Sequence, residues 1–119
     1  MLNPHGNVRV WLCTTATDMR KSYNGLSAMV KRDLGANPLS GEMFVFVNRK
    51  KTQMKILYFD GDGYAVWCKR LEQGTFVTPD ATSIKKPMSY GELQCLLYGI
   101  DWQNAKRFKR FSLSDSKVA

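Results

Sequence analysis

Residues 43–70 read MFVFVNRKKTQMKILYFDGDGYAVWCKR, and this stretch predicts the centre of the fold. Short runs of β-branched, aromatic and long apolar side chains alternate in it with residues that favour turns, which is the pattern of β-hairpins. The turn signal is strongest at Asp60-Gly61-Asp62-Gly63, because glycine readily takes the positive φ angles of a tight two-residue turn. We therefore predict three consecutive strands joined by two tight turns.

The first of these turns, residues 48–52 (NRKKT), carries three consecutive cations. Like charges this close repel one another, so we expect them to face solvent or an anionic partner. The candidate phosphate contacts on this hairpin are Arg49, Lys50, Lys51 and Lys55. The alternative interpretation is a charged turn that is simply solvated.

The composition of the chain indicates the kind of partner to look for. Its 119 residues include 18 Lys and Arg against 10 Asp and Glu, a formal net charge of +8. An excess of this size favours a polyanion such as DNA or RNA, although a merely basic, soluble domain has the same composition. The three cysteines are odd in number and widely spaced, which predicts reduced thiols of a cytoplasmic protein.

Targeting and membrane signals are not found in the sequence. The N-terminal residues lack a charged start followed by an apolar stretch, and no window approaches the about 18 uninterrupted apolar residues of a membrane span. We expect a protein without membrane contact.

Two helices are expected outside the three central strands. The first has an apolar stripe at helical spacing, begins at a cap on Thr17 or Asp18, and ends near Leu34, because Gly35 suits a left-handed C-terminal cap. Gly25 inside this helix suggests a close approach to the sheet.

The second helix is predicted after Ser89, since Ser89 and Glu92 have the spacing of a capping box. Its expected apolar face consists of Leu93, Leu96, Leu97 and Ile100.

Two more strands complete the predicted sheet, at residues 8–12 and 75–78, with residues 78–88 as a loop. The predicted fold class is therefore α+β: a single domain over residues 1–102 with a mostly antiparallel sheet of about five strands and two main helices. Residues 103–119 are expected to form a basic tail that is flexible or ordered by a partner, and its Lys106, Arg107, Lys109 and Arg110 are further candidate nucleic-acid contacts.

The central strands carry apolar residues at both alternating positions, so both sheet faces need cover, by one helix on each side or by a second subunit. Counting alternate residues within each strand groups Val45 with Leu57 and Trp67 on one face, and Phe44 with Ile56 on the other. A homo-oligomer is compatible with this pattern.

Signatures of catalysis and of metal binding are weak. His5, the only histidine, lies between a proline and a glycine, so no histidine-based triad or histidine-rich metal site can be assembled. Asp60 and Asp62 could be a carboxylate pair for a divalent cation, but a calcium loop would need Glu where Leu71 stands, and turn formation is the preferred interpretation. We predict no enzymatic activity, no catalytic residues, no metal and no cofactor.

Short motifs spread along the chain resemble one known family. In chain order they are VWL (10–12), TDMRK (17–21), YNGL (23–26), PLSG (38–41), FVF (44–46), KILY (55–58), DGDG (60–63), KRLE (69–72) and GIDW (99–102). Together they resemble the small accessory proteins called TnpB, encoded by the second reading frame of bacterial insertion sequences of the sixty-six type. The resemblance covers about residues 7–102 and leaves the tail outside.

What the resemblance implies is a role in transposition beside a separate, larger transposase that performs DNA strand transfer. It implies neither an active site nor particular binding residues. The RNA-guided nucleases that share the name TnpB are a different family, for which this chain is too short and too poor in carboxylate clusters.

Two hypotheses for the molecular role remain open. The first is a nucleic-acid-binding module, with DNA as the expected partner, that helps the transposase on the element ends. The second is a protein-interaction subunit that binds the transposase or another element-encoded accessory protein without direct DNA contact. The dependence of binding on salt concentration distinguishes them, because phosphate contacts release counterions.

Overall fold

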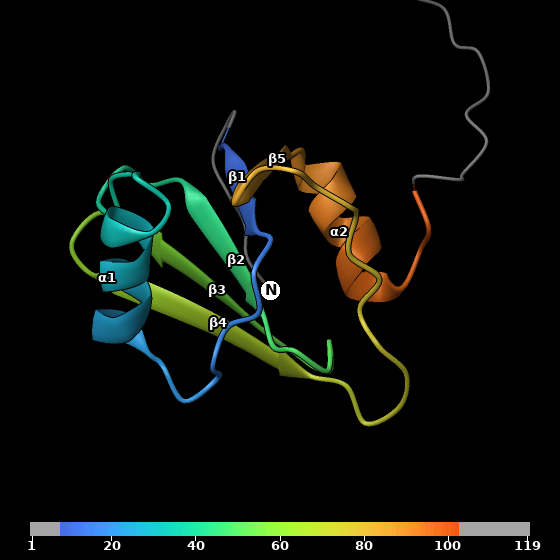
Figure 1. Cartoon of the computed structure of the whole chain (residues 1–119). Helices are drawn as coiled ribbons and strands as arrows, with labels where there is room; N and C mark the ends of the chain where they lie inside the picture. The colour runs from blue at the N-terminus through green and yellow to red at the C-terminus, as the bar shows by residue number, and fades with distance from the viewer. Residues whose placement is uncertain (1–7, 103–119) are drawn as a thin grey trace, which may run out of the picture.

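A five-stranded sheet with one helix on each face forms the computed structural model, which describes residues 8–102 (Figure 1). Its elements are β1 (Val10–Cys13), α1 (Tyr23–Arg32), β2 (Met43–Val47), β3 (Gln53–Phe59), β4 (Tyr64–Arg70), β5 (Lys85–Met88) and α2 (Tyr90–Tyr98). This is the α+β class that the sequence predicts. The predicted tail over residues 103–119 lies outside the described residues.

The strands are ordered β4-β3-β2-β1-β5 across the sheet. β1 and β2 are parallel, with α1 between them in the chain, and the other neighbouring pairs are antiparallel. The three strands predicted over residues 43–70 are β2, β3 and β4, and the two turns between them are where the sequence places them.

The two helices divide the apolar core into two layers. On the α1 side, Leu26 and Val30 pack with Phe44, Phe46 and Leu57 of the sheet. On the α2 side, the buried residues include Val10, Leu12, Val45, Val47, Ile56, Leu93, Leu96 and Leu97, with the half-buried Trp67 against them. Each face of the sheet is thus covered by one helix, the first of the two arrangements that the sequence leaves open.

The grouping of strand residues by alternation alone was wrong. Val45 pairs with Ile56, and Phe44 pairs with Leu57. Directly paired residues share a face, and the register joins positions of opposite parity, so Leu57 lies on the α1 side with Phe44. Only the cross-strand register, which depends on the length of each turn, fixes these faces.

The fifth strand is not the one predicted. Residues 75–78 form no strand; instead Phe76 is buried and its amide donates to the carbonyl of Lys51 at 2.7 Å. The fifth strand is β5, within the predicted loop, where Lys85 pairs with Cys13 and Met88 with Val10. A Lys-Lys-Pro sequence has weak strand propensity, so this non-local pairing with β1 overrides the local signal.

The first helix is shorter than predicted at both ends. It begins at Tyr23 rather than after a cap at Thr17 or Asp18, and it ends at Arg32. Asp18 instead accepts hydrogen bonds from Arg20 in the preceding connection. Gly35 has φ +60°, the left-handed conformation that the sequence indicates for the end of this helix.

Gly25 does not mark a close approach of α1 to the sheet. A Cβ atom at this position would meet the side chain of Lys21 at 3.1 Å, within the same segment of the chain.

The capping box predicted at the start of α2 is present. The Ser89 hydroxyl accepts from the amide of Glu92, and the Glu92 carboxylate accepts from the amide of Ser89, each at 3.0 Å. Ile100 is 55% exposed and was wrongly placed on the apolar face, because Gly99 takes a left-handed conformation and ends the helix before it. Within residues 8–102, no helix has the length and apolar character to cross a membrane.

Candidate nucleic-acid interface

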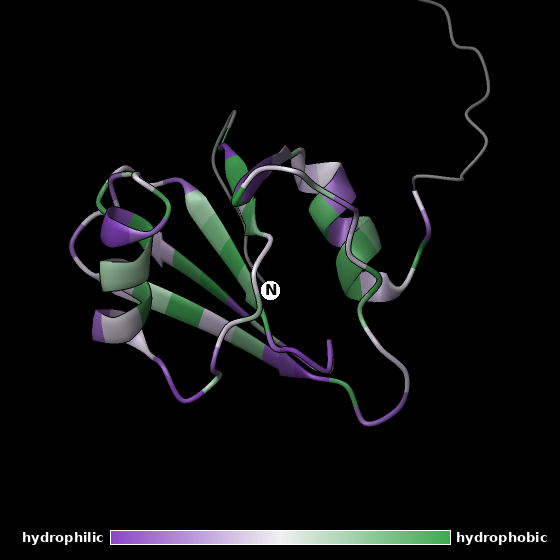
Figure 2. Cartoon of the chain, in the orientation of Figure 1, coloured by the Kyte–Doolittle hydropathy of each residue, from purple (hydrophilic) through white to green (hydrophobic). Residues whose placement is uncertain are grey.

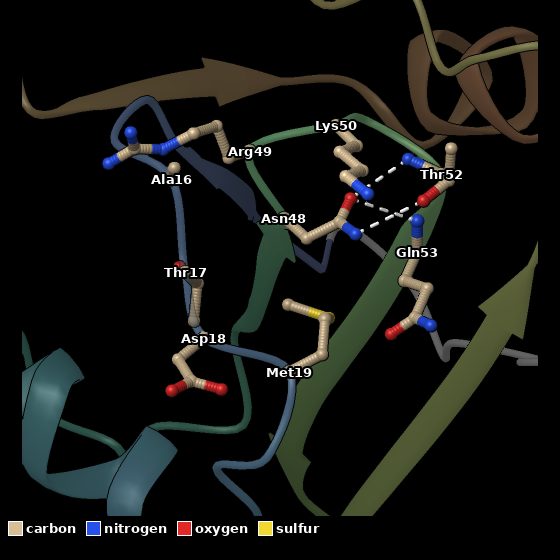
Figure 3. Close-up of a pocket in the computed structure, with 9 residues that line it drawn as sticks. All are labelled: Ala16, Thr17, Asp18, Met19, Asn48, Arg49, Lys50, Thr52 and Gln53. Atoms are coloured by element: carbon tan, nitrogen blue, oxygen red, sulfur yellow. Dashed lines mark hydrogen bonds between the residues drawn. The ribbon is translucent and has the colours of Figure 1, made fainter.

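The β2–β3 turn is held in one conformation by the side chain of Asn48. Its Oδ1 accepts from the amides of Thr52 and Gln53 at 2.8 and 3.0 Å, and its Nδ2 donates to the Thr52 hydroxyl at 3.1 Å (Figure 3). The sequence marks Asn48 only as a turn-forming residue. In the structure it is the residue that fixes the cations beside it.

Lys51 anchors the turn to a distant part of the chain. Its φ is +58°, a left-handed conformation that costs a non-glycine residue about 1–2 kcal/mol. Hydrogen bonds offset this cost: the Lys51 carbonyl accepts from the amide of Phe76 at 2.7 Å, and its Nζ donates to the Thr78 hydroxyl at 2.7 Å. The turn is therefore tied to the long connection between β4 and β5.

The four cations predicted on this hairpin fall into two kinds. Lys55 donates from Nζ to the carbonyl of Lys21 at 2.7 Å, which joins β3 to the segment before α1, and Lys51 is bound as described above. Arg49 and Lys50 are exposed, and their side chains form no hydrogen bond or ion pair with any other residue between 8 and 102. Only these two are wholly available to an external anion.

A groove runs between this turn and the β1–α1 connection (Figure 3). It has a volume of about 660 Å³ and is lined by Ala16, Thr17, Asp18, Met19, Asn48, Arg49, Lys50, Thr52 and Gln53. A smaller groove of about 210 Å³ shares Ala16, Asn48 and Arg49 with it and continues towards Thr14, Thr15, Lys51 and Thr78. Arg49 thus borders both grooves. The hydroxyls of Thr52 and Thr78 beside them accept hydrogen bonds within the chain, and such hydroxyls can still donate to phosphate oxygens.

The β1–α1 connection was predicted only as a polar link, and its contribution to the groove was missed. The amide of Thr17 donates to the carbonyl of Val47 at 2.9 Å, which holds the connection against the end of β2. The Thr17 side chain is buried, and its hydroxyl has no hydrogen-bond partner in the described part of the chain. The four-residue run Thr14 to Thr17 was the available signal, but its pairing with β2 spans 30 positions of sequence.

The one acidic residue in the wall of the larger groove is neutralised by its neighbour. Asp18 accepts from the Arg20 guanidinium, with the closest contact at 2.6 Å, and these hydrogen bonds lower the pKa of Asp18 to about 2. The same pairing raises the pKa of Arg20. Asp18 is therefore ionised at neutral pH but paired, and it adds little net negative charge to the groove.

The sheet topology gathers cations beyond the turn. β1, β2 and β4 finish at the same end of the sheet where β3 and β5 begin. We call this end the basic end; its cations include Arg20, Arg49, Lys50, Lys51, Lys69, Arg70, Lys85 and Lys86, and its acidic residues include Asp18, Glu72 and Asp80. The opposite end, called the acidic end, includes Glu42, Asp60, Asp62 and Glu92.

Several cations of the basic end are partly committed within the chain. Lys69 donates to the carbonyl of Leu97 at 3.0 Å, at the C-terminus of α2, where the helix dipole favours a positive charge. Arg70 pairs with Glu72 at 3.1 Å, and Lys85 lies 4.5 Å from the centre of the Trp11 ring. These contacts leave Arg49 and Lys50 as the adjacent free pair.

Asp60 and Asp62 lie in the β3–β4 turn, as predicted, where both are exposed and the amide of Asp60 donates to the carbonyl of Gly63 at 2.7 Å. Among residues 8–102, no three His, Cys, Asp or Glu side chains are grouped so that they could hold a metal ion. The predicted tail contacts Lys106, Arg107, Lys109 and Arg110 lie outside the described residues.

The family is decided by comparison with known proteins. The model of the family described as IS66 Orf2 like protein matches residues 8–107. The chain belongs to this family. The match extends five residues past Trp102 and so includes Lys106 and Arg107, which the motif-based resemblance left outside.

Two relatives of the IS66 Orf2-like chain come from Sinorhizobium fredii. The uncharacterized protein y4hO is 41% identical over 104 residues, which are 87% of this chain and 90% of the relative. The uncharacterized protein y4jC is 35% identical over 107 residues, 90% of this chain and 92% of the relative. No solved structure matches. As a member of the IS66 Orf2-like family, the chain is an accessory protein of transposition.

Proposed function

We propose that this accessory protein binds the phosphate backbone of DNA at the basic end, with Arg49 and Lys50 as its principal contacts. The observation that carries the proposal is the state of these two side chains: adjacent, exposed and unpaired, on a turn that Asn48 and Lys51 hold rigid. A preorganised cationic site loses less conformational entropy on binding than a mobile one.

The pairing of the other cations supports this choice. Residues 8–102 contain 13 Lys and Arg, and within that range only Lys21, Lys31, Arg49 and Lys50 lack a hydrogen bond, an ion pair or an aromatic ring as partner. Lys21 and Lys31 stand singly, before and on α1. Arg49 and Lys50 are neighbours beside a groove.

The tail is proposed as a second, additive contact. Residues 103–119 contain five Lys and Arg and one Asp, so half of the net charge of +8 lies there. The tail would then add phosphate contacts that do not depend on the β2–β3 turn, through Lys106, Arg107, Lys109 and Arg110.

The test is the salt dependence of binding to a labelled DNA duplex, measured by fluorescence anisotropy. Each phosphate contact contributes about −0.9 to the slope of log affinity against log salt, so Arg49→Ser with Lys50→Ser should flatten the slope by about 1.8. The matched control is Lys31→Ser with Arg32→Ser, which removes two exposed charges on α1 and should leave the slope of the parent protein.

An unchanged slope in the Arg49 and Lys50 variant would contradict the turn as the site. Replacing Lys106, Arg107, Lys109 and Arg110 by Ser in the full chain then measures the share of the tail, at most about 3.6 units of slope for four contacts.

A second candidate function is a protein-interaction subunit, which the exposed Tyr98 and Ile100 at the end of α2 favour. The proposed partner is the transposase or another element-encoded accessory protein. Recovery of that partner by the tagged chain after nuclease treatment, together with no affinity for DNA at low salt, would replace the nucleic-acid proposal with this one.

A further inference from the structure

The two edge strands of the sheet differ in how they are protected. β5 has four residues, Lys-Lys-Pro-Met, and short strands with lysine and proline are poor templates for another strand. β4 has seven residues and no proline, and β3 is its one neighbour in the described sheet (Figure 1). A long edge strand without proline can pair with a further strand.

Alternation along β4 shows which backbone groups face outward. In the β3–β4 register, Asp60 bonds to Gly63, and the amide of Leu71 donates to the carbonyl of Thr52 at 2.8 Å. Hydrogen-bonded pairs alternate with non-bonded pairs in an antiparallel ladder, so the odd-numbered residues 63–71 point their backbone groups at β3. The backbone groups of Tyr64, Val66, Cys68 and Arg70 therefore face the open edge.

The side chains of β4 also suit a further strand. Tyr64, Ala65, Val66 and Trp67 are each only partly buried, Tyr64 and Val66 against the α1 side and Trp67 against the α2 side. Figure 2 shows this apolar middle of β4 followed by hydrophilic residues at its C-terminal end. A strand laid along β4 would cover apolar surface on both faces of the sheet.

The charges at the two ends of β4 identify the partner. Asp60 and Asp62 precede the strand, whereas Lys69 and Arg70 end it. A second copy of the same strand, laid antiparallel, places the acidic start of each beside the basic end of the other, and opposite charges across strands stabilise the pair.

We propose that two copies of this chain associate through β4, antiparallel, into one continuous sheet with its two-fold axis at Val66. In this register Val66 lies opposite Val66 of the partner subunit, Tyr64 lies opposite Cys68 of the partner subunit, and Asp62 lies opposite Arg70 of the partner subunit. The exposed ion pair of Arg70 with Glu72 is weak and gives way to the new contact. Two-fold dimers with an isologous interface are the commonest homo-oligomers.

The pairing does not depend on the proposed function, but it has a consequence for it. A two-fold axis perpendicular to a sheet turns the two basic ends in opposite directions. The dimer would present two separate anion-binding ends, one on each side.

The first test is the mass of the full chain by sedimentation equilibrium over a dilution series. The parent should approach twice 13.6 kDa as its concentration rises. Cys68→Pro removes an outward amide and leaves the bonds to β3, so this variant should remain a single chain; the matched control Cys68→Ser keeps the amide and should still associate. Thermal melts in dilute solution establish that each variant is folded.

Charge exchange provides a second variant should Cys68→Pro fail to fold. Arg70→Glu places like charges opposite Asp62 and should reduce association, and adding Asp62→Lys should restore it. A parent that keeps the mass of one chain up to a concentration of about 1 mM would overturn the proposal, because the dissociation constant would then exceed about 1 mM. An association that survives Cys68→Pro and Arg70→Glu alike would overturn it too.

The register of the proposed β4 pairing can be tested with an engineered disulfide. In an antiparallel ladder, residues that exchange two backbone hydrogen bonds, as Tyr64 and Cys68 of the partner subunit would, have Cα atoms about 5.5 Å apart, within the range that a disulfide spans. Tyr64→Cys should therefore become linked to Cys68 of the partner subunit on mild oxidation and migrate as a dimer on a non-reducing gel. The double variant Tyr64→Cys with Cys68→Ser should migrate as a single chain on the same gel. A covalent dimer of this double variant would contradict the register.

Discussion

The turns at the two ends of the sheet both reverse the chain between antiparallel strands but are held by different contacts. At the acidic end, the β3–β4 turn is closed by its own hydrogen bond between Asp60 and Gly63. At the basic end, the β2–β3 turn is bound through Lys51 to Phe76 and Thr78, residues far away in the sequence. Long-range anchoring of this kind keeps a turn rigid enough to serve as a binding site, whereas a self-contained turn only reverses the chain.

The largest expected effect in this comparison comes from Asn48→Ala. The substitution removes three hydrogen bonds and should lower the free energy of unfolding by about 2 kcal/mol, or the melting temperature by about 10 °C. The matched change at the acidic end, Asp62→Asn, keeps the turn conformation and should stay within about 0.5 kcal/mol in dilute solution. Equal melting temperatures for Asn48→Ala and the parent would contradict the proposed difference between the two turns.

Lys55→Met separates cations that stabilise the fold from those free to bind an anion. Loss of the hydrogen bond to the Lys21 carbonyl should lower the free energy of unfolding by about 1.5 kcal/mol. The salt dependence of DNA binding should remain that of the parent, because this ammonium group is already committed. A slope flattened by about 0.9 would show that Lys55 contacts phosphate after all.

At the acidic end, replacement of Glu92 should have a small effect on the free energy of unfolding, and this effect should depend on pH. The hydrogen bond from the Ser89 amide holds the pKa of Glu92 below its ordinary value of 4.5. A carboxylate with a lowered pKa stabilises the fold above its ordinary pKa and loses this contribution as the pH falls through the folded value. Glu92→Gln should therefore be less stable than the parent at pH 7, and this difference should shrink below about pH 4.5.

Chemical denaturation at a series of pH values measures this difference. Gln preserves an acceptor for the Ser89 amide but cannot accept from the Trp102 indole with its amide nitrogen, so a deficit of about 0.5–1 kcal/mol at neutral pH is expected. If the loss of stability in Glu92→Gln instead grew as the pH fell, this result would contradict the stabilising role of the charged carboxylate.

Most local signals in the sequence were confirmed where the structure they describe is local, although the helix cap expected at Thr17 or Asp18 was wrong. The Asp-Gly turn, the Ser89 capping box and the left-handed Gly35 each depend on residues within a few positions of one another. The cations of the β2–β3 turn were found for the same reason, since their clustering is a property of consecutive residues.

The rest of the candidate interface was beyond such signals. Nothing near Lys85 indicates a strand, because its place in the sheet comes from pairing with Cys13. Nothing near Lys55 shows that its ammonium group binds the carbonyl of Lys21. The groove likewise requires the Thr17 connection to lie against Val47.

The sequence by itself determined the α+β class, the turns, the capped second helix, the net charge and the family. Only the tertiary structure decided which residues share a face, which segment supplies the fifth strand, and which cations are free. The reason is physical: turns and caps form from short-range backbone geometry, whereas register and the pairing of a flexible lysine depend on the groups that folding brings beside them. Arg49 and Lys50 stand apart from Lys51 and Lys55 because folding provides partners for the latter pair alone.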